Sequence, residues 1–176
     1  MTKQPEDKTP PIDIRLYRAG PADIANISRI AEQTWPVCYR GIVSDEQLPI
    51  MLEHYYSPEA LARQMQEGQR FWIALLGGKV SGFASATQEN DLIWLRKLYV
   101  LPSAQGYGLG KTLFEAIVAN HANARYMRLN VNQNNHPAIA FYRRLGFEVA
   151  EASKVVMAGF EFDDYVMEKQ LQSASA

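Results

Sequence analysis

A glycine-rich turn in the middle of the chain has the residue types and spacing of a phosphate-binding loop. It follows the apolar run Leu98-Tyr99-Val100-Leu101 and precedes a segment with helical spacing. The residues of the turn are Gln105, Gly106, Tyr107, Gly108, Leu109, Gly110 and Lys111. Glycines let the backbone approach a ligand closely, and the free N–H groups at the start of a helix attract anions. The turn therefore predicts a site for a ligand that carries phosphate.

Two common phosphate-binding motifs do not fit this turn. The ATP-binding P-loop needs a glycine where the chain has Gln105, and it needs a later strand that ends in an acidic residue, whereas Leu129 is followed by Asn130. The dinucleotide motif needs a third glycine where its two possible frames place Lys111 and Leu113. A nucleoside triphosphatase and a dinucleotide-dependent enzyme are therefore disfavoured.

A second motif begins at Asn135, 30 residues after Gln105. Its fixed positions are Asn135, Ala138, Phe141, Tyr142, Gly146 and Phe147. Together with the pattern Gln105-x-x-Gly108-x-Gly110, it resembles the two signatures of the GNAT superfamily of acyl-CoA N-acyltransferases. The resemblance covers residues 71–169. It implies an α/β (α+β) fold in which a mixed central sheet is flanked by helices.

The GNAT resemblance implies acetyl-CoA as the cosubstrate and assigns roles around the first motif. In the family, the backbone amides of the loop hold the pyrophosphate, which implies cofactor binding by residues 105–110, with Lys111 as a further candidate for a phosphate contact. The strand residues Leu98, Tyr99 and Val100 are implied to pair their backbone with the pantetheine arm. The backbone N–H of Leu98 is implied to polarise the thioester carbonyl.

Asn135 and Tyr142 take their implied roles from the second motif. Asn135 is implied to hydrogen-bond the pantetheine arm, and Tyr142 to donate a proton to the leaving thiolate. A phenol with a pKa of about 10 only weakly protonates a thiol with a pKa of about 8.5, so a hydrogen-bond donor or a buried structural tyrosine is the alternative. Phe141 and Leu145, four positions apart on a predicted helix, and Phe147 are expected in the core.

The general base is the least defined part of the predicted site. An alkyl amine has a pKa of about 10.4, so it arrives protonated and must lose a proton before it attacks. Many GNAT relatives carry a glutamate on the strand before the loop, but residues 92–97 contain no acid. We therefore expect deprotonation through an ordered water. Asp163, Asp164 and Glu46 are candidate bases, and plain surface charges are the alternative.

The amine acceptor is expected near the N-terminal helices. The stretch Trp35-Pro36-x-x-Tyr39-x-Gly41 is similar to that of bacterial PaiA-like acetyltransferases, which include spermidine and spermine acetyltransferases. This resemblance implies a small-molecule amine acceptor, such as a polyamine, near Trp35, Tyr39 and Glu46. Packing of Trp35 and Tyr39 onto the sheet is the alternative. Acetylation of a protein N-terminus or lysine, and coenzyme binding without catalysis, are the competing functions.

The spacing of apolar residues predicts the elements that position these side chains. Strands are predicted at 12–17, 71–76, 80–87, 92–101, 125–131, 147–156 and 162–171. Helices are predicted from Ile24 to a break at Pro36, after Ser44, from Ser57, after the glycine-rich turn and over 137–145. The Gly77-Gly78 pair predicts a tight hairpin. The first half of the sheet is expected to be largely antiparallel.

Length, composition and charge limit the class of protein. The 176 residues, 47% of them hydrophobic, favour one domain over 12–171 with flexible tails at 1–11 and 172–176. The formal net charge of −1 argues against nucleic-acid binding. No apolar run approaches the roughly 20 residues of a membrane span, and the polar N-terminus has no signal-peptide pattern. A cytoplasmic protein is therefore expected.

The cysteine and histidine residues give no sign of a metal site. Cys38 is the only cysteine, which excludes an internal disulfide. His54, His121 and His136 are far apart and have no metal-ligand spacing, so no metal is expected. Dimers are common in the GNAT family, so a homodimer is compatible with the resemblance, although no residue indicates one.

Overall fold

Within residues 11–171, which the computed structural model describes, seven strands form one mixed sheet. The tails predicted at 1–11 and 172–176 lie outside the described residues, except for Pro11. The strands are β1 (Ile14–Arg18), β2 (Arg70–Leu76), β3 (Lys79–Glu89), β4 (Leu92–Val100), β5 (Tyr126–Asn132), β6 (Glu148–Met157) and β7 (Phe160–Gln170). The helices are α1 (Ile24–Cys38), α2 (Gln47–Tyr56), α3 (Pro58–Gln66), α4 (Leu109–Ala119) and α5 (His136–Arg144), with single 3-10 turns η1 (Pro21–Asp23) and η2 (Pro102–Ala104). The predicted fold class and the predicted order of elements are confirmed.

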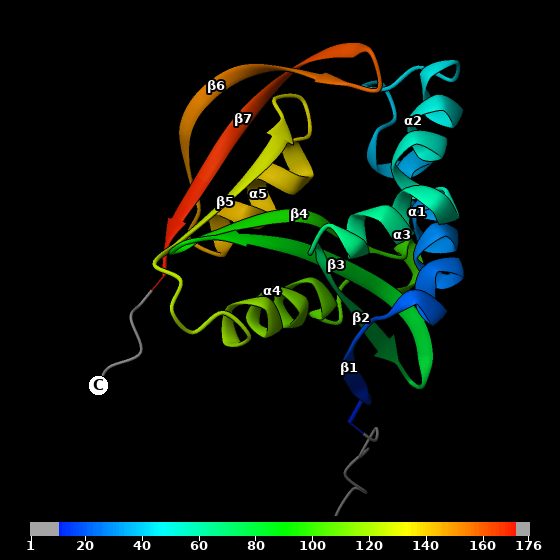
Figure 1. The fold of residues 1–176 in the computed structure, drawn as a ribbon, viewed down its shortest axis with the longest axis vertical. Helices are drawn as coiled ribbons and strands as arrows, with labels where there is room; N and C mark the ends of the chain where they lie inside the picture. Colours follow the sequence, from blue (N-terminus) through cyan, green and yellow to red (C-terminus); the bar gives the residue numbers. More distant parts are fainter. Residues whose placement is uncertain (1–10, 172–176) are drawn as a thin grey trace, which may run out of the picture.

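The sheet has the order β1-β2-β3-β4-β5-β7-β6 (Figure 1). Among the described strands, every neighbouring pair is antiparallel except β4 and β5, which run parallel. The predicted hairpin at Gly77-Gly78 joins β2 and β3, and both glycines have positive φ, which glycine adopts at least cost. Residues 92–94 of β4 pair with 126–128 of β5, and the two strands then separate. The sheet is therefore split at its parallel junction.

Side-chain alternation gives the sheet a core on each face. Phe71 and Ile73 of β2 pack with α1, α2 and α3, whereas Trp72 and Ala74 pack with α4 and α5. This follows from the period of two in a strand. Figure 1 shows α4 on one side of β3 and β4, with α1, α2 and α3 grouped on the other. The tip of the β6–β7 hairpin, near Ala158, reaches α2 (Figure 1).

A bulge in β4 decides which of its side chains face each core. The β3 partners of Leu95 and Lys97 are adjacent in sequence, so Arg96 is an extra residue in β4. A bulge of this kind interrupts the regular alternation of side chains. As a result, Leu95 and Leu98 both pack in the core on the α4 side. Lys97 and Tyr99 instead contact side chains of α2.

The prediction that Pro36 breaks the first helix is wrong, because α1 continues to Cys38. Proline is unfavourable in the interior of a helix because it has no backbone N–H to donate. Here it stands in the last turn, while Ile30 and Trp35 of the same helix are buried. We infer that packing of these side chains offsets the lost hydrogen bond. The longer helix brings Tyr39, which directly follows it, to the sheet.

Ser57 caps α3, whereas the N-cap predicted at Ser44 is wrong, because α2 begins at Gln47 with Glu46 as its N-cap and Ser44 lies in the turn before it. Ser57 Oγ accepts a hydrogen bond from the backbone N–H of Ala60 at 3.3 Å, and Pro58 is the first residue of α3. The Gln47 N–H donates to Ser44 Oγ at 3.1 Å, and the Ser44 N–H donates to Gln47 Oε1 at 3.0 Å. This reciprocal pair stabilises the turn that leads into α2. Over residues 11–171, none of the helices has the length and apolar character needed to span a bilayer.

Candidate active site

A cavity of about 1520 Å³ lies where β4 and β5 separate. It extends from the loop before α4 and the start of α5 to the end of α1 and the β6–β7 hairpin. Of the residues predicted to bind the cosubstrate, those that line it are Leu98, Tyr99, Val100, Gln105, Gly106, Gly108, Leu109, Gly110, Lys111, Asn135 and Tyr142. The acceptor candidates Trp35 and Tyr39 line the same cavity. The fold thus brings the two predicted motifs and the end of α1 around one space.

Some predicted residues lie elsewhere than expected. Tyr107 is 45% exposed and does not line the cavity, and Glu46 is the N-cap residue of α2, away from the cavity wall. Phe141 and Leu145, which were expected in the core, are half-buried and line the cavity. Phe147 is buried, as predicted. The helix that carries Phe141 and Leu145 therefore forms a wall of the site.

The loop before α4 leaves the start of that helix open to the cavity. Gly106 and Gly108 have φ values of +87° and +84°, in the left-handed region that favours glycine. The carbonyl of Gly108 accepts the Thr112 N–H at 3.0 Å, which closes the first helical turn. The N–H groups ahead of Thr112 have no acceptor within the helix, and the helix dipole makes this end positive. Together with Lys111, which lines the cavity, this end fits a pyrophosphate group.

Asn135 caps α5 at the edge of the cavity. Its Oδ1 accepts a hydrogen bond from the Ala138 N–H at 3.3 Å. The role implied for Asn135 by the family resemblance was a hydrogen bond to the pantetheine arm. Because its oxygen is used by the cap, its amide nitrogen is the group that remains for such a contact.

Tyr142 stands on α5 between the cavity and the core. Its ring lies 5.3 Å from the ring of Phe141 and 5.7 Å from that of Phe147, between centroids. Burial raises the pKa of Tyr142 well above the usual value of 10, and the nearby Tyr39 and Cys38 raise it further. Its phenol is therefore protonated at neutral pH. It has the form needed to donate a hydrogen bond or a proton.

Four aromatic side chains, Trp35, Tyr39, Tyr56 and Tyr99, line the cavity on the side of α1 and α2. The Trp35 ring centroid lies 4.5 Å from that of Tyr39 and 5.4 Å from that of Tyr56. The hydroxyl oxygens of Tyr39 and Tyr99 are 2.8 Å apart and hydrogen-bonded. Burial raises the pKa of Tyr39 to about 12, so this phenol is neutral at physiological pH. Trp35 and Tyr39 thus pack onto the sheet, as the alternative expected, and they also border the cavity.

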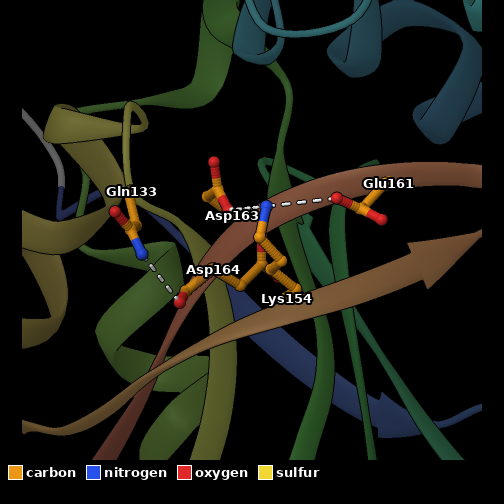
Figure 2. Close-up of polar contacts among 5 residues, drawn as sticks. All are labelled: Gln133, Lys154, Glu161, Asp163 and Asp164. Atoms are coloured by element: carbon orange, nitrogen blue, oxygen red, sulfur yellow. Dashed lines mark hydrogen bonds and ion pairs between the residues drawn. The ribbon is translucent and has the colours of Figure 1, made fainter.

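The two neighbouring aspartates of β7 have different surroundings. Figure 2 shows Asp163 beside Lys154, whose Nζ lies 3.2 Å from the Asp163 carboxylate and 3.1 Å from that of Glu161. Asp164 is only 5% exposed and lines the cavity. Its backbone carbonyl accepts a hydrogen bond from Gln133 Nε2 at 3.2 Å (Figure 2). Of the three candidate bases, Asp164 alone borders the cavity.

The pKa of the Asp164 carboxyl group lies in the range that suits a general base. Burial raises the pKa of Asp164 from 3.8 to about 6, a hydrogen bond from Asn132 partly offsets this, and the charge of Asp163 adds to it. Tyr39, which follows α1, lies near enough for its own pKa to be affected by the Asp164 charge. A general base works best when its pKa lies near the operating pH.

Lys97 is a cavity residue that sequence reasoning missed. Its Nζ lies 4.7 Å from the ring centroid of Tyr56 and 5.7 Å from that of Tyr55. Burial lowers the pKa of Lys97 from 10.5 to about 8, and the charge of Arg96 lowers it further. The sequence shows an Arg-Lys pair inside an apolar strand, which was a signal of an unusual site. The bulge that turns Lys97 toward α2 could not be predicted from the amino-acid sequence.

Comparison with known proteins identifies the family of this fold and cavity. The model of the acetyltransferase (GNAT) family matches residues 29–147, which is more than half of the chain. An uncharacterized N-acetyltransferase of Mycobacterium tuberculosis is 27% identical over 153 residues, covering 85% of this chain and 98% of that protein. The spermidine N(1)-acetyltransferase of Thermoplasma acidophilum is 25% identical over 170 residues, covering 92% of this chain and 100% of that protein.

A solved structure supports the same fold. The crystal structure of the PaiA N-acetyltransferase from Thermoplasma acidophilum in complex with coenzyme A superposes with a TM-score of 0.76. The two chains share 23% sequence identity, and the match covers 90% of this chain and 99% of that chain. At this level of identity, the likeness concerns the fold.

Proposed function

This chain belongs to the GNAT family of acetyltransferases, and we propose that it transfers the acetyl group of acetyl-CoA directly to the primary amine of a small molecule. One observation carries the proposal. A single cavity joins the open start of α4, the separated end of β4 and the protonated phenol of Tyr142. These are the parts that a held thioester donor and its leaving thiolate require.

The proposed binding mode uses backbone groups at two places. The N–H groups at the start of α4 bind the pyrophosphate, and Lys111 lies beside them for a further phosphate contact. The part of β4 that has separated from β5 offers its backbone to the pantetheine arm. In this arrangement the N–H of Leu98 polarises the thioester carbonyl, and the amide nitrogen of Asn135 contacts the arm.

The proposed reaction is a direct displacement. The neutral amine attacks the thioester carbonyl carbon, a C–N bond forms, the C–S bond breaks, and the thiolate of coenzyme A leaves. One amine proton passes to the carboxylate of Asp164, directly or through an ordered water. The hydroxyl of Tyr142 donates a hydrogen bond to the departing thiolate, which takes a proton from solvent to become the thiol, while Asp164 returns its proton to solvent. Cys38 takes no part, because direct transfer forms no acyl-enzyme.

The test is thiol release from acetyl-CoA by the purified protein, measured across spermidine, spermine, lysine, small monoamines and an N-terminal peptide. Saturable release that depends on one of the small amines, with the acetylated amine identified by mass spectrometry, is the expected result. The name of the Thermoplasma relative supports a polyamine as one acceptor to include. Turnover with the peptide alone would replace the small-molecule proposal by protein acetylation. Tight coenzyme binding with no turnover would support coenzyme binding without catalysis, as in a sensor of acyl-CoA.

A further inference from the structure

We infer that the amine acceptor of this enzyme also carries an anionic group, a carboxylate or a phosphate, and that Lys97 binds this group. The inference rests on the proposed acetyl transfer and names the chemical class of its acceptor. It is carried by the position of one lysine, by the groups that surround it and by the balance of charge in the cavity.

Lys97 lies on the acceptor side of the cavity. The bulge at Arg96 places Lys97 on the face of β4 that looks toward α2. There its ammonium group lies over the rings of Tyr55 and Tyr56, at 5.7 Å and 4.7 Å from their centroids. Tyr56 also contacts Trp35, whose ring lies 5.4 Å away between centroids. Lys97 therefore lies against the aromatic side chains near which the amine acceptor was predicted to bind.

The ammonium group of Lys97 has no carboxylate partner in the described part of the chain. None of the ion pairs found among residues 11–171 includes it. Burial and the like charge of Arg96 both disfavour its charged form. Two aromatic faces contact this ammonium group, and an ammonium group also has three hydrogen-bond donors. A bound anion supplies the missing counter-charge and the missing acceptors.

The charges of the cavity wall fit an anionic amine better than a polyamine. The lysines and arginines that line it are Arg63, Arg96, Lys97, Lys111 and Arg144, besides His54, and the acidic residues are Glu67 and Asp164. Lys111 and Arg144 belong to α4 and α5, at the end assigned to the coenzyme phosphates. The acceptor side is thus left with three cations and two carboxylates. One of those carboxylates, Asp164, is assigned to the reacting amine. The remaining ammonium groups of a polyamine would lie beside Lys97 and be repelled by its charge.

The test compares acceptors that differ only in the anionic group. Lysine and cadaverine have the same carbon chain and amine, but cadaverine lacks the carboxylate. Phosphoethanolamine and ethanolamine form the corresponding pair for phosphate, and spermidine represents the polyamines. Steady-state kinetics at saturating acetyl-CoA give kcat and KM for each acceptor. We expect the wild type to prefer the anionic member of one pair by at least about tenfold in kcat/KM, and the pair that shows the preference distinguishes carboxylate from phosphate.

Variants of Lys97 separate a binding role from a proton-transfer role. Lys97→Met keeps an unbranched side chain and removes its charge, and we expect it to raise KM for the anionic acceptor and to abolish the preference. Lys97→Glu should reverse the preference in favour of cadaverine and spermidine. The KM for acetyl-CoA should stay within about twofold in both, because Lys97 lies away from the start of α4. Lys79→Met is the matched control, since Lys79 is exposed and does not line the cavity.

Calorimetry keeps this inference separate from the proposed function. Binding of lysine and of cadaverine is measured with coenzyme A present, so that no reaction is needed. Tighter binding of the anionic member, lost in Lys97→Met, supports the inference even if no amine is acetylated, in which case only the proposed function fails. Equal or better binding and turnover of cadaverine or spermidine by the wild type overturns the inference and leaves acetyl transfer intact. An equal fall in kcat for every amine in Lys97→Met also overturns it, because that pattern belongs to a base.

Discussion

Gly110 of α4 lies directly against the ring of Phe141 of α5. A Cβ atom built on Gly110 would stand 3.0 Å from Cζ and 3.2 Å from Cε2 of Phe141. These two residues belong to the two motifs that the sequence places 30 residues apart. The contact therefore couples the open start of α4 to the helix that carries Tyr142.

Gly110→Ala should weaken both coenzyme binding and folding. Overpacking costs about 1–3 kcal/mol, which exceeds the gain of about 0.5–1 kcal/mol that alanine brings to a helix. We expect a net loss of roughly 1 kcal/mol in the free energy of unfolding and a higher KM for acetyl-CoA. Urea unfolding and steady-state kinetics measure the two effects. Gly20→Ala is the control, because a Cβ there meets nothing within 4 Å. An unchanged KM in Gly110→Ala would refute the coupling.

Tyr142→Phe should lower kcat and leave acetyl-CoA binding nearly unchanged. The substitution removes the hydroxyl and keeps the ring that packs against Phe141 and Phe147. Loss of a positioned proton donor typically costs about 10²-fold or more in rate. Tyr126→Phe serves as the control, because Tyr126 does not line the cavity. If kcat is the same in Tyr142→Phe and the wild type, the phenol has no part in the chemistry and Tyr142 is a structural residue.

The sequence predicted the fold well because its signals are local. The strand pattern of residues 12–17, the Gly77-Gly78 turn and the helix start at Ser57 act over a few residues, and the structure confirms them. Pro36 was misjudged because tertiary packing of α1 outweighed a local preference. Local signals decide a helix end only where packing does not compensate.

The candidate site was predictable as far as its motifs extend. Asn135, Tyr142 and residues of the glycine-rich turn were predicted from the sequence, and they border one cavity. Whether Asp163 or Asp164 faces that cavity depends on which side of the sheet each side chain takes, which is set by the pairing of β7 with its neighbours. The orientation of Lys97 depends on a bulge in β4, which is set by the pairing with β3. Such long-range relationships appear only once the chain is folded.

Asp164→Asn should lower kcat/KM at pH 7.5 by roughly 10²-fold, as expected for loss of a general base. In the wild type, kcat/KM should rise with pH through about 6, where the carboxyl of Asp164 loses its proton. That limb should be absent in the variant. Asn132 of β5 and Asp163 of β7 act on the pKa of Asp164, and Tyr39, which follows α1, stays neutral over this range. Asp163→Asn is the matched control, and an equal loss in both variants would argue for a general field effect.

Lys97→Met should stabilise the protein at neutral pH while it removes the proposed acceptor contact. Burial lowers the pKa of Lys97 in the folded state to about 8, below its ordinary value of 10.5. The contribution of Lys97 to stability is therefore fully present above pH 10.5 and is lost as the pH falls through about 8. At pH 7 we expect the variant to gain about 1–2 kcal/mol in the free energy of unfolding, because methionine fills the space without a charge.

The pH dependence of this gain distinguishes a strained cation from simple repacking. Urea unfolding of the wild type and Lys97→Met is compared at pH 7 and at pH 10.5, with Lys79→Met as the exposed control. The gain should shrink toward zero at the higher pH, where the wild-type lysine is neutral in both the folded and the unfolded chain for much of the time. A gain that is the same at both values would mean that methionine packs better for reasons unrelated to charge. A loss at pH 7 would mean that the contacts of the ammonium group with Tyr55 and Tyr56 outweigh its desolvation.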